Sequence, residues 1–372
     1  MSPTRSLTQT LLRSSAVAAL TSPHGVDRYL EILNPMWAAY EVRARILAVH
    51  RETDGPAPVA TITLQPTGTW AGFRAGQYVQ LGLETTGTTG TTGASGGRRF
   101  TRCFSISSGE SGPGERFTLT VRANPDGEVS KFLVREARPG QVVHLAPAAG
   151  EFTLPDPLPA RLLMISGGSG ITPVMSMLRT LLAQGYDGHV TFLHYARSPE
   201  HQIFRDELAA ISRDAGTVDV RLVYPEAGGE PFTAEGLARL LPDHRQVDTW
   251  ACGPAGLVEL VQRAYAGGDG PSKLRVEYFK TPVVSTGDAE GTVSFTRDGR
   301  HGPNTGATLL EQAEALGLTP EYGCRMGICF SCTSRKTEGT VRNVVTGAQS
   351  SLPDEDIQIC VSAPVGDCAV DL

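Results

Sequence analysis

Four cysteine side chains near the C-terminus have a spacing that suits iron chemistry. Cys324, Cys329 and Cys332 follow the pattern C-x4-C-x2-C, and 27 residues separate Cys332 from Cys360. A loop that supplies three thiolates, followed by a fourth from a later strand, is the arrangement that ligates a [2Fe–2S] cluster. Gly327 would allow the positive φ that such a loop needs where it turns tightly. The spacing therefore predicts a centre that passes one electron at a time.

Zinc is the alternative metal for the same four thiols. Structural zinc sites usually combine two short C-x2-C pairs, and here the second pair is missing. The iron–sulfur interpretation is therefore favoured. The remaining chain should then bring electrons to the cluster and carry them away.

The bulk properties limit the class of protein. At 372 residues the chain is long enough for two or three domains. Its net charge of −6 argues against a nucleic acid as partner. No apolar run approaches the roughly 20 residues of a membrane span. Because Arg13 and two serines interrupt the apolar segment 7–20, we expect neither a transmembrane span nor a signal peptide.

The other cysteines indicate the compartment. They are scattered singly along the chain, at Cys103, Cys252 and Cys368. Single thiols suit a reducing environment rather than a disulfide scaffold. We therefore expect a cytoplasmic protein.

From residue 41 onward, short strand-like segments separated by turns predict a small antiparallel barrel. Short runs of strand-forming residues are separated by turn residues, at 42–49, 61–64, 78–81, 117–121 and 142–145. The Thr/Gly/Ser tract 84–97 has too little apolar content to bury a face, and we interpret it as a mobile hairpin tip.

Beyond residue 155 the pattern changes to alternating strands and helices. Strands are predicted at 162–166, 190–195, 218–223, 249–252 and 274–278, and helices at 173–184, 203–213, 233–241 and 254–265. This alternation is typical of a doubly wound parallel sheet. The last segment opens with a strand at 292–296, has one helix at 308–316 and carries the cysteine loop.

Two stretches of the barrel have the residue types that a flavin needs. Strand alternation puts Arg102 and Phe104 on one side, which offers a cation to a phosphate and a flat ring for stacking. The segment 127–130 is predicted to open a helix with Ser130 as its cap, and its backbone N–H groups could hold a pyrophosphate. Taken singly, an ordinary surface strand and an ordinary helix cap would explain both stretches.

Two further stretches suit a nicotinamide nucleotide. The glycine-rich turn 167–173 would let the backbone approach a pyrophosphate, with a helix N-terminus behind it, although it is not G-x-G-x-x-G. Cys252-Gly253-Pro254 follows a strand and would place a small polarizable side chain beside the path of a hydride. Taken alone, Cys252 is more often a buried core thiol.

The end of the second nucleotide strand bears on the choice of coenzyme. A carboxylate there would hold a ribose 2′-hydroxyl, whereas arginine favours a 2′-phosphate. No acid comes directly after the strand, and Glu200 follows only later. We therefore favour NADPH over NADH, with Arg197, Ser198 and Arg205 as phosphate ligands. The alternative is that these are solvated surface side chains.

In series, the motifs R-x-[FY]-S, G-x-V-S, G-G-S-G-I-T-P and C-G-P resemble the ferredoxin–NADP reductase superfamily. With the cysteine motif fused behind them, residues 41–372 resemble the reductase components of oxygenases and desaturases. The resemblance implies FAD, with FMN as the alternative, held by Arg102, Cys103, Phe104, Ser105, Gly127, Val129 and Ser130. It implies nucleotide contacts from Gly167, Gly168, Gly170, Thr172, Pro173, Arg197, Ser198, Arg205, Gly253 and Pro254.

The resemblance also implies which residues lie where the hydride would be transferred. They are Thr172, Cys252 and the acidic–x–aromatic pair Glu277 and Phe279. The expected architecture is multidomain, with an N-terminal extension, an antiparallel β-barrel flavin domain, an α/β doubly wound nucleotide domain, a linker and an α+β, β-grasp-like ferredoxin domain. Their predicted bounds are 1–40, 41–155, 156–280, 281–288 and 289–372.

The implied activity is electron transfer from NADPH through FAD and the [2Fe–2S] cluster to an oxygen-activating acceptor. The segments 34–37, 195–198 and 203–208 most resemble actinobacterial reductases that serve fatty acyl-CoA desaturases, so a membrane desaturase is the first prediction. The alternatives are the reductase component of a Rieske or di-iron oxygenase and, more remotely, a redox sensor without turnover. We expect a monomer, in which residues 1–40 pack on the chain itself or contact a partner or membrane surface.

Overall fold

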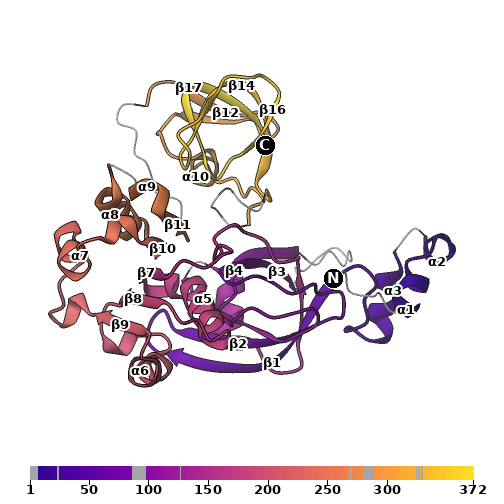
Figure 1. Ribbon diagram of the computed structural model, residues 1–372. Helices are drawn as coiled ribbons and strands as arrows, with labels where there is room; N and C mark the ends of the chain where they lie inside the picture. Colours follow the sequence, from indigo (N-terminus) through magenta and orange to yellow (C-terminus); the bar gives the residue numbers. More distant parts are fainter. Residues whose placement is uncertain are drawn as a thin grey trace. The chain divides into compact units, whose positions relative to one another are not determined.

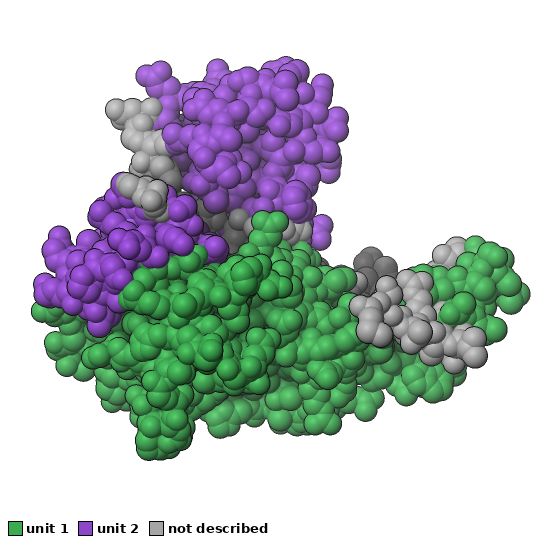
Figure 2. Space-filling view, in the orientation of Figure 1, with its two compact units in different colours: residues 1–231, 247–250 green, residues 232–246, 251–372 purple. Residues whose placement is uncertain are grey.

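A computed structural model describes residues 7–22, 25–85, 98–125, 127–267, 270–279, 289–323, 325, 327 and 330–372 (Figure 1). The chain forms two compact units, residues 1–231 with 247–250 and residues 232–246 with 251–372 (Figure 2). One unit boundary falls inside the parallel-sheet segment, so the domain limits given above stay predictions. The expected linker 281–288 and most of the Thr/Gly tract lie outside the described residues.

The predicted antiparallel barrel is confirmed. Its strand order is β4-β3-β6-β1-β2-β5. Alternate side chains of each strand point inward, and a stack of Trp70 on Phe117, with ring centroids 4.9 Å apart, closes the core. Burial of such large apolar side chains stabilises the fold by about 1.5–3 kcal/mol each. The strands are β1 (Val42–Thr53), β2 (Val59–Pro66), β3 (Tyr78–Thr85), β4 (Arg98–Ser105), β5 (Phe117–Arg122) and β6 (Val142–Leu145).

The α/β segment forms the expected nucleotide-type sheet in the order β11-β10-β7-β8-β9, in which β7, β8 and β9 pair in parallel. Because the chain reverses its progress through the sheet at β7, the turn after β7 lies where such folds bind ligands. The strands are β7 (Arg161–Gly167), β8 (His189–Tyr195), β9 (Val218–Val223), β10 (Asp248–Gly253) and β11 (Leu274–Tyr278). The helices are α5 (Ile171–Ala183), α6 (Arg205–Asp214), α7 (Ala234–Leu240), α8 (Ala255–Tyr265) and α9 (Gly270–Lys273).

Helix α5 begins two residues earlier than the sequence indicates. Pro173 is therefore its third residue, where the missing N–H would have had no intrahelical partner. The helix ends at Ala183, and Gly185 follows with φ +67°, the left-handed conformation that terminates helices.

The C-terminal segment has a mixed sheet packed on one helix, as the α+β prediction requires. The order is β13-β12-β17-β14-β15, with β16 paired to β14. Helix α10 (Leu309–Ala315) starts with a capping box between Thr308 and Glu311. The strands are β12 (Thr292–Phe295), β13 (Arg300–Pro303), β14 (Thr333–Asn343), β15 (Gln349–Ser350), β16 (Glu355–Gln358) and β17 (Ser362–Asp371).

Three short helices form the N-terminal extension, α1 (Leu7–Leu12), α2 (Ser15–Leu20) and α3 (Val26–Leu33). The buried carboxylate of Asp27 accepts hydrogen bonds from the N–H groups of Ala39, Tyr40 and Glu41 at 2.5, 2.9 and 2.7 Å. The fully buried guanidinium of Arg43 donates to the carbonyls of Pro35 and Trp37. The extension is thus attached through polar groups, while apolar side chains stay exposed, Ile32 and Leu33 among them. Among the described residues no helix is long and apolar enough to cross a membrane.

Candidate flavin, nucleotide and cluster sites

The first flavin stretch lies on β4. Arg102 is opposite Leu81 and Phe104 opposite Val79 in the antiparallel register, so all four side chains share one side of the sheet. Leu81 and Val79 are fully buried in the barrel core, and Phe104 packs against that core while half-exposed. The following Ser105 is buried, and Cys103 is half-buried on the other side. The roles of these residues toward a flavin stay predictions.

The second stretch corrects one expectation. Helix α4 (Glu128–Lys131) is capped by Gly127 and not by Ser130, which lies inside the helix. The Ser130 hydroxyl accepts from the N–H of Asn124 and donates to the carbonyl of Gly127, both at 3.1 Å, so it closes the preceding turn. A Cβ on Gly127 would lie 2.7 Å from that hydroxyl oxygen. Val129 is buried in the barrel core, which fixes the helix to the barrel.

The glycine-rich turn joins β7 to α5 through the 3-10 segment η2 (Gly168–Gly170). Gly168 has φ +53°, which glycine adopts without strain. The buried hydroxyl of Thr172 donates to the carbonyl of Ser169 at 3.1 Å. This bond shapes the turn, and Pro173 is buried behind it.

Cys252 and Glu277 are close enough to influence each other electrostatically. Burial raises the pKa of the Cys252 thiol well above its ordinary value, and the Glu277 carboxylate adds to the rise. Burial also raises the pKa of Glu277 to about 8, and its Oε2 has no hydrogen-bond partner among the described residues. Both side chains are therefore mainly protonated at neutral pH. Gly253 ends β10, Pro254 caps α8, and half-buried Phe279 follows β11.

Two of the three residues expected to bind a 2′-phosphate, Ser198 and Arg205, interact with Glu200. The Ser198 hydroxyl donates to the Glu200 carboxylate and lies 2.9 Å from Nδ1 of His201. This hydrogen bond is the main cause of the lowered pKa of Glu200, to which Arg205 also contributes. Arg197 is exposed. Glu200, which the sequence argument sets aside, is thus a candidate site residue.

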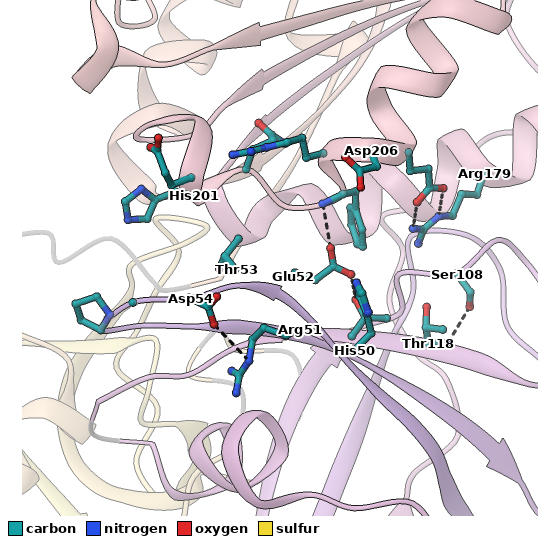
Figure 3. A pocket seen from close by; sticks show the side chains of 18 of the residues that line it. His50, Arg51, Glu52, Thr53, Asp54, Ser108, Thr118, Arg179, His201 and Asp206 are labelled. Carbon is teal, nitrogen blue, oxygen red and sulfur yellow. Dashed lines mark hydrogen bonds and ion pairs between the residues drawn. The ribbon is translucent and has the colours of Figure 1, made fainter.

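A cavity of about 1230 Å³ lies between the β1–β2 turn and the start of α6 (Figure 3). On its floor, Glu52 accepts from the hydroxyl of Thr61 at 2.6 Å and from the N–H of Phe204 at 3.2 Å. Phe204 caps α6 with φ +57°, a left-handed conformation that costs a non-glycine residue free energy. The sequence gives no signal for this cavity, because the segments that line it are far apart in the chain.

Arg179 connects three elements at this cavity (Figure 3). Its guanidinium forms two hydrogen bonds with Glu207 of α6, at 2.8 and 2.5 Å, and lies 4.4 Å from the centroid of the Phe204 ring. It also donates to the carbonyl of Ser107 in the barrel. The start of α6, and with it the backbone of Arg205, is therefore fixed relative to the barrel.

Two of the four predicted cluster ligands are described, and the structure brings them together. Cys332 and Cys360 are both buried, and the N–H of Ile359 donates to the carbonyl of Cys332 at 3.3 Å. Cys324 and Cys329 lie outside the described residues. Cys368 is also buried, and burial raises the pKa of its thiol to about 11, as in an inert core residue.

The loop that contains Gly327 passes very close to Val361, which directly precedes β17. Gly327 has the expected positive φ, +75°, and a Cβ there would lie 2.8 Å from Cγ2 of Val361. Arg325 ties the same loop to α10 through an ion pair with Glu314 and stacks 3.9 Å from the ring centroid of Tyr322. Buried thiols held by such a loop fit a cluster that excludes water.

Replacing Gly327 by alanine is expected to remove the cluster. The added methyl group would meet Val361, and φ +75° is strained for alanine. Iron and acid-labile sulfide should fall by more than half while flavin content is unchanged. Gly256→Ala is the control, because a Cβ there has open space. Full iron and sulfide in Gly327→Ala would show that the close approach is not required.

Glu277→Gln is expected to change the pH dependence of stability. The carboxyl titrates near 4.5 when unfolded and near 8 when folded, so ionisation disfavours the folded state as pH rises through this window. The wild type should therefore lose up to a few kcal/mol between about pH 5 and 8 relative to the variant. Thermal unfolding midpoints across this range measure the difference. Parallel curves for both proteins would mean that Glu277 ionises normally.

Comparisons with known proteins place these sites in a family. Residues 164–263 match the model of the oxidoreductase NAD-binding domain, and residues 299–365 match that of the 2Fe-2S iron-sulfur cluster binding domain. The second match contains all four predicted cluster ligands. The cysteine pattern is thus confirmed as an iron–sulfur signature rather than a zinc site.

Relatives extend the match over nearly the whole chain. An NADPH oxidoreductase of Mycobacterium tuberculosis is 37% identical over 359 residues, 95% of this chain and 90% of the relative. The ferredoxin reductase component of 3-ketosteroid-9-alpha-monooxygenase, from the same species, is 32% identical and covers 72% of this chain and 78% of its own length. The solved structure of phthalate dioxygenase reductase covers 89% of this chain and 97% of its own, with a TM-score of 0.57 at 20% identity.

The match to the solved structure supports the multidomain fold. The sequence matches show that the chain is related to these reductases. The NAD-binding and iron–sulfur segments lie in the chain order that the motifs indicate. The chain therefore belongs to the ferredoxin–NADP reductase-like oxidoreductases that carry a C-terminal [2Fe–2S] ferredoxin domain.

Proposed function

We propose that this NAD(P)H-dependent oxidoreductase is an NADPH-driven reductase that delivers single electrons to an oxygen-activating protein. The observation that carries the proposal is the fusion, in one chain, of a flavin-type barrel, a nucleotide-type sheet and a four-cysteine loop. Tethering the ferredoxin segment replaces a bimolecular encounter by an intramolecular one at high effective concentration.

The protein contributes binding, orientation and exclusion of water. FAD, when bound, takes electrons in pairs, and a [2Fe–2S] cluster passes them on singly. Arg102, Phe104 and the start of α4 would hold the flavin, and Cys324, Cys329, Cys332 and Cys360 the cluster. Cys252 and Glu277 are buried and mainly protonated, so they offer an uncharged, water-excluding surface. FAD is preferred to FMN because it is the flavin that the family resemblance implies.

The cluster is tested by replacing one ligand. Cys329→Ser should leave flavin reduction by NADPH intact and lower the rate of cytochrome c reduction by more than tenfold. The control is Cys368→Ser, which alters a buried thiol outside the ligand set. Visible spectra, iron analysis and extraction of the flavin accompany the kinetics. Unchanged cytochrome c reduction in Cys329→Ser would remove the cluster from the electron path.

The preference for NADPH is supported by Arg197 and Arg205 and by the name of the most similar relative described above. One observation favours NADH instead. Glu200 lies beside Ser198 and Arg205, where a carboxylate could accept a hydrogen bond from a ribose 2′-hydroxyl. The two coenzymes therefore have to be separated by experiment.

Arg197→Ala is expected to raise the KM for NADPH about tenfold and that for NADH much less, since only NADPH carries a 2′-phosphate. Steady-state kinetics with both coenzymes measures the ratio. Glu200→Gln is the converse test. It should weaken the binding of NADH selectively if the carboxylate binds the ribose. Equal effects of Arg197→Ala on both coenzymes would contradict the assignment of this arginine.

The acceptor we propose is an oxygenase component. The support is the relative named as the ferredoxin reductase component of a monooxygenase. Neither relative described above is named for a desaturase, so the membrane desaturase remains the second candidate, resting on the sequence resemblance. Spectral reduction of a purified Rieske protein, compared with a di-iron desaturase in vesicles, separates the two. Rapid NADPH oxidation with ferricyanide would count against a redox sensor without turnover.

A further inference from the structure

The N-terminal extension carries a concentration of exposed apolar side chains. Among the described residues, the other exposed large apolar side chains, apart from Tyr40, are spread over residues 158–365. Single exposed apolar residues are normal on a protein surface, whereas a group of them marks an interaction site. The group in the extension, which we call the extension surface, consists of Leu11, Leu20, Tyr29, Ile32, Leu33 and Trp37.

Helix α3 turns its apolar face away from the barrel. Tyr29, Ile32 and Leu33 are three and four residues apart and share one face of the helix, and they are 43%, 74% and 74% exposed. Asp27 on the other side is buried and accepts the N–H groups of residues 39–41. Helices on the surface of a globular protein usually have the opposite orientation. The polar side of α3 therefore makes the attachment, and the apolar side remains exposed.

The charges of the extension are also divided between its two sides. Residues 1–40 contain Arg5, Arg13 and Arg28 and two acids, Asp27 and Glu31. Asp27 is buried, and Glu31 is half-buried and lies 3.6 Å from the guanidinium of the buried Arg43. Arg28 is exposed, and no acid among the described residues from 7 to 40 is exposed, although the whole chain has a net charge of −6. The outward side is therefore apolar and positively charged, which complements an anionic surface.

We propose that the extension surface docks this protein on an anionic lipid bilayer. Aliphatic side chains and the rings of Tyr29 and Trp37 suit the boundary between headgroups and acyl chains, where Tyr and Trp are enriched. Arg28 would interact with lipid phosphates. The three described helices of the extension have six to eight residues, so the docking would be peripheral. The inference goes beyond the proposed function, because it concerns where the reductase works and not what it reduces.

A second copy of the chain is a less suitable occupant of the same surface. In a symmetric dimer the same patch lies on both sides of the contact. Arg28 of each copy would then be brought toward a positively charged surface, with no exposed acid of the described extension to offset it. An anionic bilayer attracts the same charge and accepts the same apolar side chains.

The test is co-sedimentation of the full-length, flavin-loaded protein with vesicles. Wild-type protein should sediment with vesicles that contain phosphatidylglycerol and phosphatidylcholine, and about fivefold less with vesicles of phosphatidylcholine alone. The double variant Ile32→Asp/Leu33→Asp should lower the fraction bound to the anionic vesicles about tenfold, because charges replace side chains that enter the bilayer. Arg28→Gln should lower binding to the anionic vesicles only.

Leu352→Asp is the matched control. Leu352 is 66% exposed, similar to Leu33, but it lies between β15 and β16, outside the extension. This variant should bind vesicles like the wild type. All variants should keep the wild-type unfolding temperature and the wild-type rate of ferricyanide reduction by NADPH, because they alter exposed side chains. If the proposed function failed, the wild type would lack that rate but would still sediment with the vesicles.

The opposite results would overturn the proposal. They are a wild type that does not sediment with the anionic vesicles, and sedimentation that the double variant leaves unchanged. Equal binding to both kinds of vesicle would refute the choice of an anionic surface. A wild-type dimer, detected by light scattering, that becomes a monomer in the double variant would assign the extension surface to a second copy. Slower electron delivery to a soluble oxygenase protein by the double variant, without vesicle binding by the wild type, would assign it to the acceptor.

Discussion

The interactions of Arg179 hold α5, the start of α6 and the barrel together. A single guanidinium contacts a barrel carbonyl, a carboxylate of α6 and the ring of Phe204. Its two hydrogen bonds to Glu207 have a fixed geometry that a lysine could not reproduce. Because Phe204 caps α6 in a left-handed conformation, this contact and the bond from its N–H to Glu52 must together offset backbone strain. The placement of Arg205 depends on them.

Buried polar side chains are accommodated in two different ways along the chain: by hydrogen bonds to backbone groups, or in their neutral form. The buried carboxylate of Asp27 accepts hydrogen bonds from backbone N–H groups, and two nitrogens of the buried Arg43 guanidinium donate to backbone carbonyls. Cys252 and Glu277 are buried without such partners, and burial favours their neutral forms. The first solution anchors the N-terminal extension. The second leaves both side chains mainly uncharged at neutral pH, so this buried region carries little fixed negative charge from them.

Much of the fold follows from local patterns in the sequence. The strands of the barrel and the parallel sheet are periodic enough to be located within a few residues, and the cysteine spacing indicates the cluster because ligand geometry fixes it. The start of α5 and the cap of α4 were predicted wrongly, since a 3-10 turn and the Ser130–Asn124 hydrogen bond decide them. Helix propensity alone does not predict such hydrogen bonds.

The contacts within the candidate site are harder to predict from local sequence patterns. Glu200 gains its role from its contacts with Ser198 and Arg205, and it belongs to none of the motifs named above. The sequence also treats Arg197, Ser198 and Arg205 as one group of phosphate ligands, whereas in the structure Ser198 and Arg205 both interact with Glu200. Pairings between separate elements determine these contacts.

The attachment of the N-terminal extension has a consequence for sequence variation. All three bonds accepted by Asp27 come from main-chain N–H groups, so these bonds do not depend on the type of side chain at residues 39–41, but Ala39 is fully buried and leaves no room for a larger residue. Position 27 itself has no conservative replacement. Asparagine would turn one oxygen into a donor that faces another donor, and glutamate would be too long for the same turn. Constancy at 27 combined with a small residue at 39 is therefore the pattern that related chains with this extension should display.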